Sequence, residues 1–271
     1  MQAVRKIFYH YLCRKEAAWE VIMNSKEVVQ SAKESFEKIL LNEKYSSIIR
    51  DDRHLDLLLN MLPLKQCSEV LDIGTGAGYL AFPVAQQDSS CNVTGIDIAE
   101  KVIIQNQVKV KENHIENLHF RSFDGINYPF TNESMDIIMS RYVFHHFPDV
   151  EMAVKQIAGI LRKNGKILLS DPVRNPDDKK KVIDKFMQVK GDGHIGFYTQ
   201  EEITSLFAKN GIYQADLKVT CMEFPFPEKQ EYNTLFNSLD NEEKEMYNIY
   251  LKENIVWIGN INVVNILMEK R

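Results

Sequence analysis

The chain has 271 residues, 33 Lys and Arg against 38 Asp and Glu, a formal net charge of -5 and 44% hydrophobic residues. This length is enough to bury a large core, and the apolar content and small net charge exclude disorder as the main state. The mildly acidic balance argues against a nucleic-acid backbone as the main partner, because phosphate binding needs clustered lysines and arginines.

The N-terminal part of the sequence predicts helices. Apolar residues recur at the i, i+3, i+4 and i+7 spacing of an amphipathic helix over residues 4–12 and again over residues 28–40. A third helix is expected to begin at a cap formed by Asp51 or Asp52 and to end before Pro63.

The segment from Glu69 to Asp171 alternates short apolar runs with helical patterns. The runs read EVLDIG, NVTGID, LHFRSFD, MDIIMS and GKILLSD, and helices are expected at Glu100–Asn113 and Val150–Arg162. Buried parallel strands read as continuous apolar runs that crossover helices separate. The pattern therefore predicts a doubly wound α/β fold.

The remainder of the chain is mixed. A helix is expected after Thr199, which forms a capping box with Glu202, and another around Glu242–Leu251. Ile212–Phe224 and Asn254–Met268 read as two long strands that complete the same sheet.

A glycine-rich turn follows the first predicted strand. The sequence VLDIGTGAG places glycines at 74, 76 and 78, with Asp72 two positions before Gly74. A dinucleotide fingerprint needs its third glycine where this chain has Tyr79, and an anionic pyrophosphate would be repelled by Asp72. The turn instead suits a cationic aminoacyl sulfonium.

Two further acids follow the next two strands. Asp97 ends the second strand, where a carboxylate accepts hydrogen bonds from ribose hydroxyls, and Ile98 can pack on an adenine. Asp124, followed by Gly125, ends the third strand and can accept from the adenine amino group. The carboxyl ends of parallel strands meet at one edge of a sheet, so we expect these side chains to share one site.

At these motifs the chain resembles the class I S-adenosylmethionine-dependent methyltransferases. The strand Met135–Arg141, the turn Leu161–Lys166 and the sequence RYVFHHF from Arg141 to Phe147 resemble the branch of ubiquinone/menaquinone C-methyltransferases and their small-molecule relatives. The resemblance implies a mostly parallel, Rossmann-like, seven-stranded sheet with an antiparallel C-terminal strand. The cofactor-binding residues that it implies are Asp72, Gly74, Thr75, Gly76, Asp97, Ile98, Asp124, Gly125 and Arg141.

The implied organisation is a helical extension or lid over residues 1–68 and a methyltransferase domain over residues 69–271. Within that domain, residues 69–171 form the cofactor core and residues 172–200 a cap. The implied reaction is an in-line displacement that moves a methyl group from S-adenosylmethionine to a small-molecule acceptor and leaves S-adenosylhomocysteine. The alternative is a regulatory or sensor protein that binds S-adenosylmethionine without turnover.

His145 and His146 follow the fourth strand and are the candidate catalytic bases. Both also have a structural interpretation, as a helix cap and as a ring packed among aromatic neighbours. A metal site with Asp149 or Asp171 is disfavoured because adjacent histidines point in different directions, so no metal is expected.

Several aromatic residues lie outside the cofactor core. Tyr45 is similar to a cofactor- or substrate-facing tyrosine of the family. Aromatic residues at such spacing are more often core than pocket; the others are Phe197, Tyr198, Phe224, Phe226 and Trp257.

The cysteine pattern and the absence of a leader predict a cytoplasmic protein. Cys13, Cys67, Cys91 and Cys221 form no C-x-x-C pair, which argues against a zinc site or a disulfide framework. The N-terminus carries charges within its apolar stretch, unlike a signal peptide, and no apolar run approaches the roughly 20 residues that span a bilayer. The expected partner is a small-molecule acceptor, with no nucleic acid, and a homodimer is left open.

Overall fold

The computed structural model describes residue 26 and residues 28–37, 51–65 and 68–271. The first predicted helix, Tyr45, Cys13 and Cys67 lie outside these residues. The second predicted helix is present over residues 28–37. The third is α3 (Asp52–Met61), and Asp51 caps it by accepting hydrogen bonds from the backbone N–H groups of Arg53 and His54. The predicted cap and the predicted end before Pro63 are therefore both confirmed.

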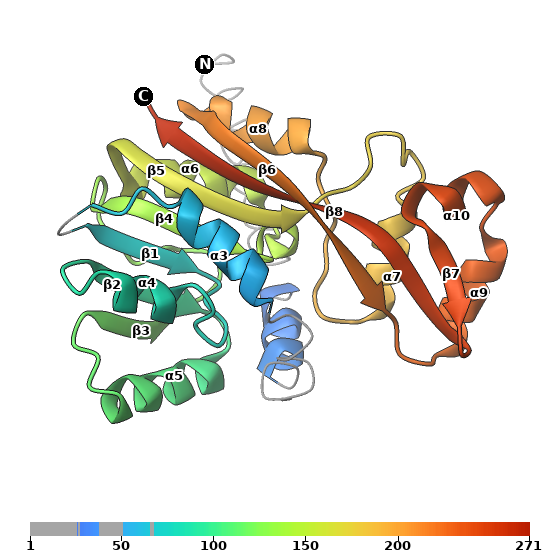
Figure 1. The fold of residues 1–271 in the computed structure, drawn as a ribbon, viewed down its shortest axis with the longest axis horizontal. Coiled ribbons are helices and arrows are strands. Elements are labelled where there is room, and N and C mark those ends of the chain that lie inside the picture. The colour runs from blue at the N-terminus through green and yellow to red at the C-terminus, as the bar shows by residue number, and fades with distance from the viewer. Residues whose placement is uncertain (1–25, 27, 38–50, 66–67) are drawn as a thin grey trace, which may run out of the picture.

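The strands form one mixed sheet (Figure 1) with the order β3-β2-β1-β4-β5-β8-β6, and β7 pairs with β8. The strands β1 to β5 are parallel, whereas β8 runs antiparallel to β5, β6 and β7. This topology confirms the predicted fold class, although the sheet of the described residues has eight strands instead of the seven expected, because the short β7 pairs with β8. The strand bounds are β1 Glu69–Ile73, β2 Asn92–Asp97, β3 Leu118–Ser122, β4 Met135–Arg141, β5 Leu161–Pro172, β6 Ile212–Pro225, β7 Ile249–Lys252 and β8 Ile255–Lys270.

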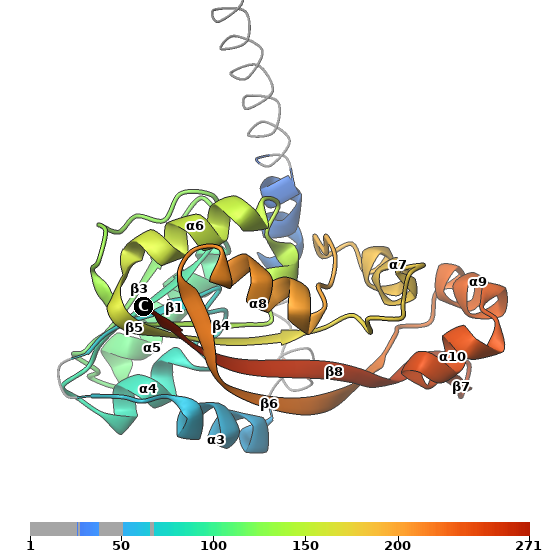
Figure 2. The ribbon, with the colours of Figure 1, turned by 90° about the horizontal axis from the view of Figure 1, so that it is seen from above.

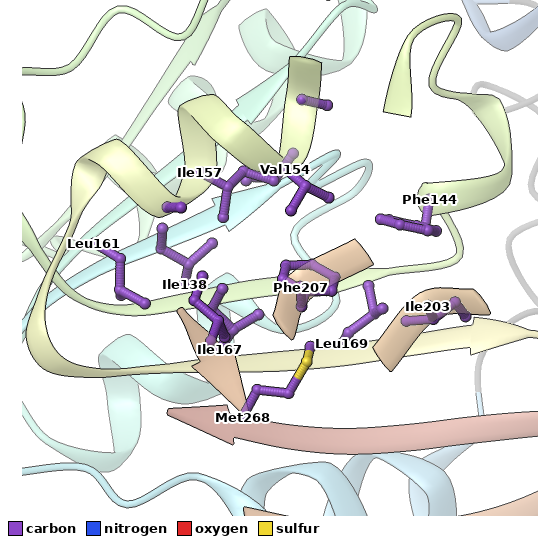
Figure 3. Packing of buried hydrophobic residues seen from close by; sticks show 14 of the residues in the cluster. Ile138, Phe144, Val154, Ile157, Leu161, Ile167, Leu169, Ile203, Phe207 and Met268 are labelled. Atoms are coloured by element: carbon purple, nitrogen blue, oxygen red, sulfur yellow. The ribbon is translucent and has the colours of Figure 1, made fainter. Parts of the chain in front are cut away.

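Helices cover both faces of the sheet (Figure 2). One face packs against α3, α4 and α5 through a core that includes Leu58, Val84 and Ile103. The other face packs against α6 and α8, and Figure 3 shows Val154 and Phe207 of these helices directed at the strands. The remaining helix bounds are α4 Ala81–Gln87, α5 Glu100–Glu112, η1 Phe144–His146, α6 Val150–Ile160, α7 Val182–Val189, α8 Gln200–Ala208, α9 Gln230–Ser238 and α10 Asn241–Tyr247.

The C-terminal part contains more elements than the sequence patterns indicate. The long strands β6 and β8 run past the main sheet, where they pack with α7, α9, α10 and β7 around a separate apolar cluster that includes Phe186, Phe226 and Ile258. The helices α7 and α9 and the strand β7 were not predicted. The helix expected to reach Leu251 ends at Tyr247, because Asn248 takes a left-handed conformation with φ of 50°.

The turn expected at Leu161–Lys166 is instead an irregular start of β5. Pairing jumps from Met135 opposite Leu161 to Ile137 opposite Lys166, and Asn164 has a φ of 62°.

Among the residues that the structure describes, no helix combines the length and the apolar character that crossing a membrane requires.

Candidate active site

A cavity of about 910 Å³ lies at the carboxyl ends of β1, β2 and β4. Its walls include residues from the glycine-rich turn, the ends of these strands and the helix over residues 28–37. All but one of the predicted cofactor-binding residues line it. These are Asp72, Gly74, Thr75, Gly76, Asp97, Ile98, Gly125 and Arg141.

The glycine-rich turn needs glycine for both its conformation and its close packing. Gly74 and Gly76 have φ values of 65° and 49°, in the left-handed region that favours glycine. A Cβ atom on Gly74 would lie 2.2 Å from Cγ2 of Val143. The absence of side chains here lets the backbone approach a ligand in the cavity.

Asp97 joins the end of β2 to this turn. Its carboxylate accepts a hydrogen bond of 2.8 Å from the backbone N–H of Gly76 and one of 2.9 Å from Ala99. Burial raises the pKa of Asp97, although these backbone donors oppose the shift. The carboxylate lines the cavity and retains acceptor capacity for a ligand.

Asp72 is a second buried acid in the same cavity. Thr75 Oγ1 donates a hydrogen bond of 2.7 Å to its carboxylate. Burial raises the pKa of Asp72 to about 7, and the negative charge of Asp97 adds to the shift. A ligand that brings a positive charge would stabilise the ionised form.

Asp124 differs from the other two acids. Its carboxylate accepts hydrogen bonds from the backbone N–H groups of Ile126 and Asn127 and from the Asn127 side chain. These bonds shape the loop after β3. Gly125 lines the cavity and Asp124 does not, so the structure does not place this carboxylate with Asp72 and Asp97.

Arg141 supplies a positive charge at the end of β4. Its guanidinium lies 3.9 Å from the ring centroid of Tyr79 and 4.0 Å from that of Tyr142. Both tyrosines line the cavity with it. Cation–π contacts with both rings help to orient the guanidinium. Neither tyrosine was predicted, because a lone aromatic residue carries no motif.

The two candidate histidines occupy different places. Nδ1 of the buried His145 lies 2.8 Å from Asp171 Oδ2, and Oδ1 of the same carboxylate accepts from the Phe144 backbone N–H. His145 is therefore part of the support of the η1 turn. His146 lines the cavity, and its buried Nδ1 has no hydrogen-bond partner among the described residues. Burial lowers the pKa of His146 to about 3, so its ring is neutral.

The helix over residues 28–37 closes one side of the cavity. A Cβ on Gly125 would lie 2.8 Å from Val29 Cγ1 and 3.0 Å from Ile98 Cγ2, and the Phe36 ring lies edge-on to His146 at 4.9 Å between centroids. This helix lies between the sheet core and α7 (Figures 1 and 2). Its amphipathic pattern could be read from the sequence, but the surface that it faces could not.

The remaining candidates contribute to packing instead. Phe197, Phe224 and Phe226 belong to the apolar cluster where β6 and β8 run past the main sheet, and Trp257 stacks on Tyr250. Tyr198 packs edge-on against Phe144. In the described parts of the chain, no group of three or more His, Cys, Asp or Glu side chains has the geometry to hold a metal ion, and no disulfide joins Cys91 and Cys221.

Comparison with known proteins identifies the family. A family model described as a methyltransferase domain matches residues 45–214, well over half of the chain. The chain belongs to this methyltransferase family. The matched segment runs from before α3 to the start of β6, so it contains every cavity residue described above except those of the helix over residues 28–37.

Relatives of this methyltransferase are similar mainly over the same segment. The uncharacterized methyltransferase YcgJ of Bacillus subtilis (strain 168) is 28% identical over 175 residues, which cover 63% of this chain and 67% of YcgJ. The 27-O-demethylrifamycin SV methyltransferase of Amycolatopsis mediterranei (strain S699) is 33% identical over 120 residues, or 44% of each chain. The match thus spans less than half of the rifamycin enzyme.

Solved structures share the fold of this methyltransferase. The crystal structure of the Bacillus subtilis protein YcgJ has a TM-score of 0.74 at 23% identity and covers 82% of this chain and 99% of its own. The geranyl diphosphate C-methyltransferase of Streptomyces coelicolor A3(2), solved with S-adenosyl-L-homocysteine, has a TM-score of 0.61 at 14% identity. The similarity covers 81% of this chain and 79% of the chain of the geranyl diphosphate C-methyltransferase.

Proposed function

We propose that this methyltransferase takes its methyl group from S-adenosylmethionine and transfers it to a small-molecule acceptor. The observation that carries the proposal is one cavity that joins two buried acids, Asp72 and Asp97, to the cation of Arg141. S-adenosylmethionine has a diol, an ammonium, a carboxylate and a sulfonium, so this set of charges complements it. When bound, it supplies a methyl group already activated on a positive sulfur.

Each charged side chain has one role in holding the donor. Asp97 accepts hydrogen bonds from the ribose hydroxyls, because the bond from the Gly76 backbone N–H holds its carboxylate beside the glycine-rich turn. Asp72 pairs with the ammonium, and Arg141 with the carboxylate. Ile98 and Val29, which both lie beside Gly125, enclose the adenine between apolar surfaces. The glycine-rich turn lets the backbone approach the donor closely.

His146 acts on the acceptor. Its ring lines the cavity and its Nδ1 has no hydrogen-bond partner among the described residues, so this nitrogen can accept a hydrogen bond from an acceptor O–H or N–H. Burial makes the ring a weak base, so it takes up the proton only as the methyl group moves and does not hold it beforehand. His145 and Asp171 hold the η1 turn that carries His146. His145 is therefore a positioning residue.

The helix over residues 28–37 serves as the lid that the N-terminal extension was expected to supply. Val29, Ala32 and Phe36 line the cavity, and together they cover it from Gly125 to His146. A closed apolar wall keeps water from the reacting atoms and holds donor and acceptor together. The cavity volume of about 910 Å³ suits a donor together with a small acceptor.

Calorimetry with S-adenosylmethionine tests the cofactor. Wild-type protein is expected to bind with a dissociation constant in the micromolar range, and Asp97→Ala to bind at least about tenfold more weakly, because two charge-assisted hydrogen bonds are lost. Asp88→Ala is the matched control, since Asp88 lies before β2, at the other end of that strand, where its carboxylate accepts hydrogen bonds from Ser90. Equal affinities for wild type and Asp97→Ala would refute the assignment.

Release of S-adenosylhomocysteine in the presence of candidate acceptors separates an enzyme from a sensor. A protein that binds the donor and forms product is an enzyme. Tight donor binding without methylation of any acceptor in a broad panel would favour the sensor alternative.

A further inference from the structure

Arg141 is held by more than its two tyrosines. The guanidinium carbon lies over the rings of Tyr79 and Tyr142, and a hydrogen bond to one of its N–H groups fixes how the guanidinium turns within its own plane. His54, on α3, makes such a bond, with Nδ1 3.5 Å from Arg141 Nη2.

The orientation of His54 is set from inside the sheet. Asn265, a fully buried residue of β8, directs its Nδ2 at the Lys218 carbonyl (3.2 Å) and at Thr220 Oγ1 (3.3 Å). A carbonyl can only accept, so the amide nitrogen must face β6 and the amide oxygen must face the opposite way. Asn265 Oδ1 lies 2.8 Å from His54 Nε2.

This arrangement determines the tautomer of His54. An amide oxygen accepts only, so Nε2 must carry the proton, and Ser170 Oγ donates to the same oxygen at 2.8 Å. Nδ1 therefore has a lone pair, which accepts from the Arg141 guanidinium, a group that can only donate. The chain Lys218–Asn265–His54–Arg141 has one consistent assignment of donors and acceptors.

The surroundings keep this ring neutral. Burial lowers the pKa of His54, and Arg141 lowers it further, whereas the bond to Asn265 and the charge of Asp51 oppose the shift. A protonated ring would direct an N–H at a guanidinium that has nothing to accept it.

We propose that His54 is a positioning residue that turns the Arg141 guanidinium toward the carboxylate of the bound donor. This inference rests on the proposed function. It assigns to α3, outside the predicted cofactor core, a part in cofactor binding. It also requires that His54 affect only ligands that carry the aminoacyl group.

Two ligands and two substitutions test the proposal. S-adenosylhomocysteine carries the carboxylate, whereas 5′-methylthioadenosine has the same nucleoside and thioether without it. His54→Gln can still donate to Asn265 but lacks an acceptor at Nδ1, and His54→Asn places an amide oxygen near the position of Nδ1. Affinities for both ligands are measured by calorimetry.

We expect His54→Gln to weaken S-adenosylhomocysteine binding by about tenfold and 5′-methylthioadenosine binding by less than about twofold, while His54→Asn recovers most of the loss. Equal losses for both ligands would mean a merely structural role and overturn the inference. Unchanged S-adenosylhomocysteine affinity in His54→Gln would overturn it too, while leaving the proposed function intact. A wild-type protein that binds neither ligand would contradict the proposed function itself.

A measurement on the unmodified protein covers the case in which the variants fold poorly. Nitrogen-15 NMR of the His54 ring distinguishes its tautomers, and at neutral pH we expect a protonated Nε2 and an unprotonated Nδ1. A protonated Nδ1 would overturn the inference.

Discussion

Ala32 lies so close to Gly193 that a Cβ added to the glycine would come within 2.6 Å of the alanine Cβ. This contact brings the helix over residues 28–37 against the loop that follows α7. A hydrogen bond supports this contact, because Ser35 Oγ donates to the Gly191 carbonyl at 2.7 Å. The same loop donates hydrogen bonds from Ile195 and Gly196 to the His145 carbonyl. The loop therefore connects the proposed lid to the turn that carries His146.

The first prediction concerns this contact. Gly193 and Gly191 have φ values of 79° and 70°, so alanine at either site costs about 1–2 kcal/mol in backbone strain. Only Gly193→Ala also pushes on Ala32, since a Cβ on Gly191 meets nothing within 4 Å. We expect Gly193→Ala to speed hydrogen exchange over residues 28–37 and to raise the dissociation rate of S-adenosylhomocysteine. Gly191→Ala is the control. Adding Ala32→Gly to Gly193→Ala should bring the hydrogen exchange and the dissociation rate back toward their wild-type values.

The second prediction concerns the stability cost of Asp72. Its folded-state pKa of about 7 exceeds the unfolded value near 3.9, so stability is lost as pH rises through this window. Asp72→Asn keeps the acceptor for Thr75 without the buried charge. We expect it to raise the free energy of unfolding at pH 8 by on the order of 2–4 kcal/mol, and by less than about 1 kcal/mol at pH 4.5. Urea unfolding at both pH values measures this, and a gain independent of pH would contradict it.

The third prediction separates the two histidines. His146→Gln removes the group that faces the acceptor and should lower kcat by about 10²–10⁴-fold if the acceptor must lose a proton. Donor affinity should stay within about threefold, because His146 is not among the donor-binding residues. Steady-state kinetics with calorimetry checks both values. Full turnover by His146→Gln would rule out the proposed base.

The fourth prediction concerns the glycine-rich turn. Gly74→Ala combines a φ of 65° with a Cβ placed 2.2 Å from Val143 Cγ2, so we expect a loss of about 3 kcal/mol in stability and no measurable donor binding. Val143→Ala in the same chain removes the two closest contacts, those with Cγ1 and Cγ2, but not the strain. The double variant should therefore regain part of the stability in urea unfolding, and no recovery would mean that strain alone is responsible.

The sequence predicted the parallel core well because β1, β2 and β4 are buried on both faces over most of their length and read as apolar runs, whereas the edge strand β3 is buried on one face only. Asp72, Asp97 and Arg141 could be placed at the cavity since they end strands of that core, and strand ends meet at one edge. Asp124 lies two residues beyond the end of the neighbouring strand β3, and its own loop takes up its carboxylate. A pattern of strand ends carries no information on such local bonds.

Contacts between distant parts of the chain could not be read in this way. His54 meets Asn265 across 211 positions, and neither lies in a motif. The short β7 and α9 were missed for a related reason, because each is stabilised by packing against β8 in the outer apolar cluster. Tyr79 and Tyr142 gain their significance only from the Arg141 guanidinium that both rings contact.

The place of β8 in the sheet has a consequence for synthesis on the ribosome. This strand follows β6 in sequence, yet it lies between β5 and β6 and bonds to both. A nascent chain that has emerged only as far as β6 therefore exposes an unpaired edge on β5 and a β6 without a partner. A ribosome that stalls before residue 255 would display both open edges, and chaperones that shield such edges would have their longest contact with the chain at this stage.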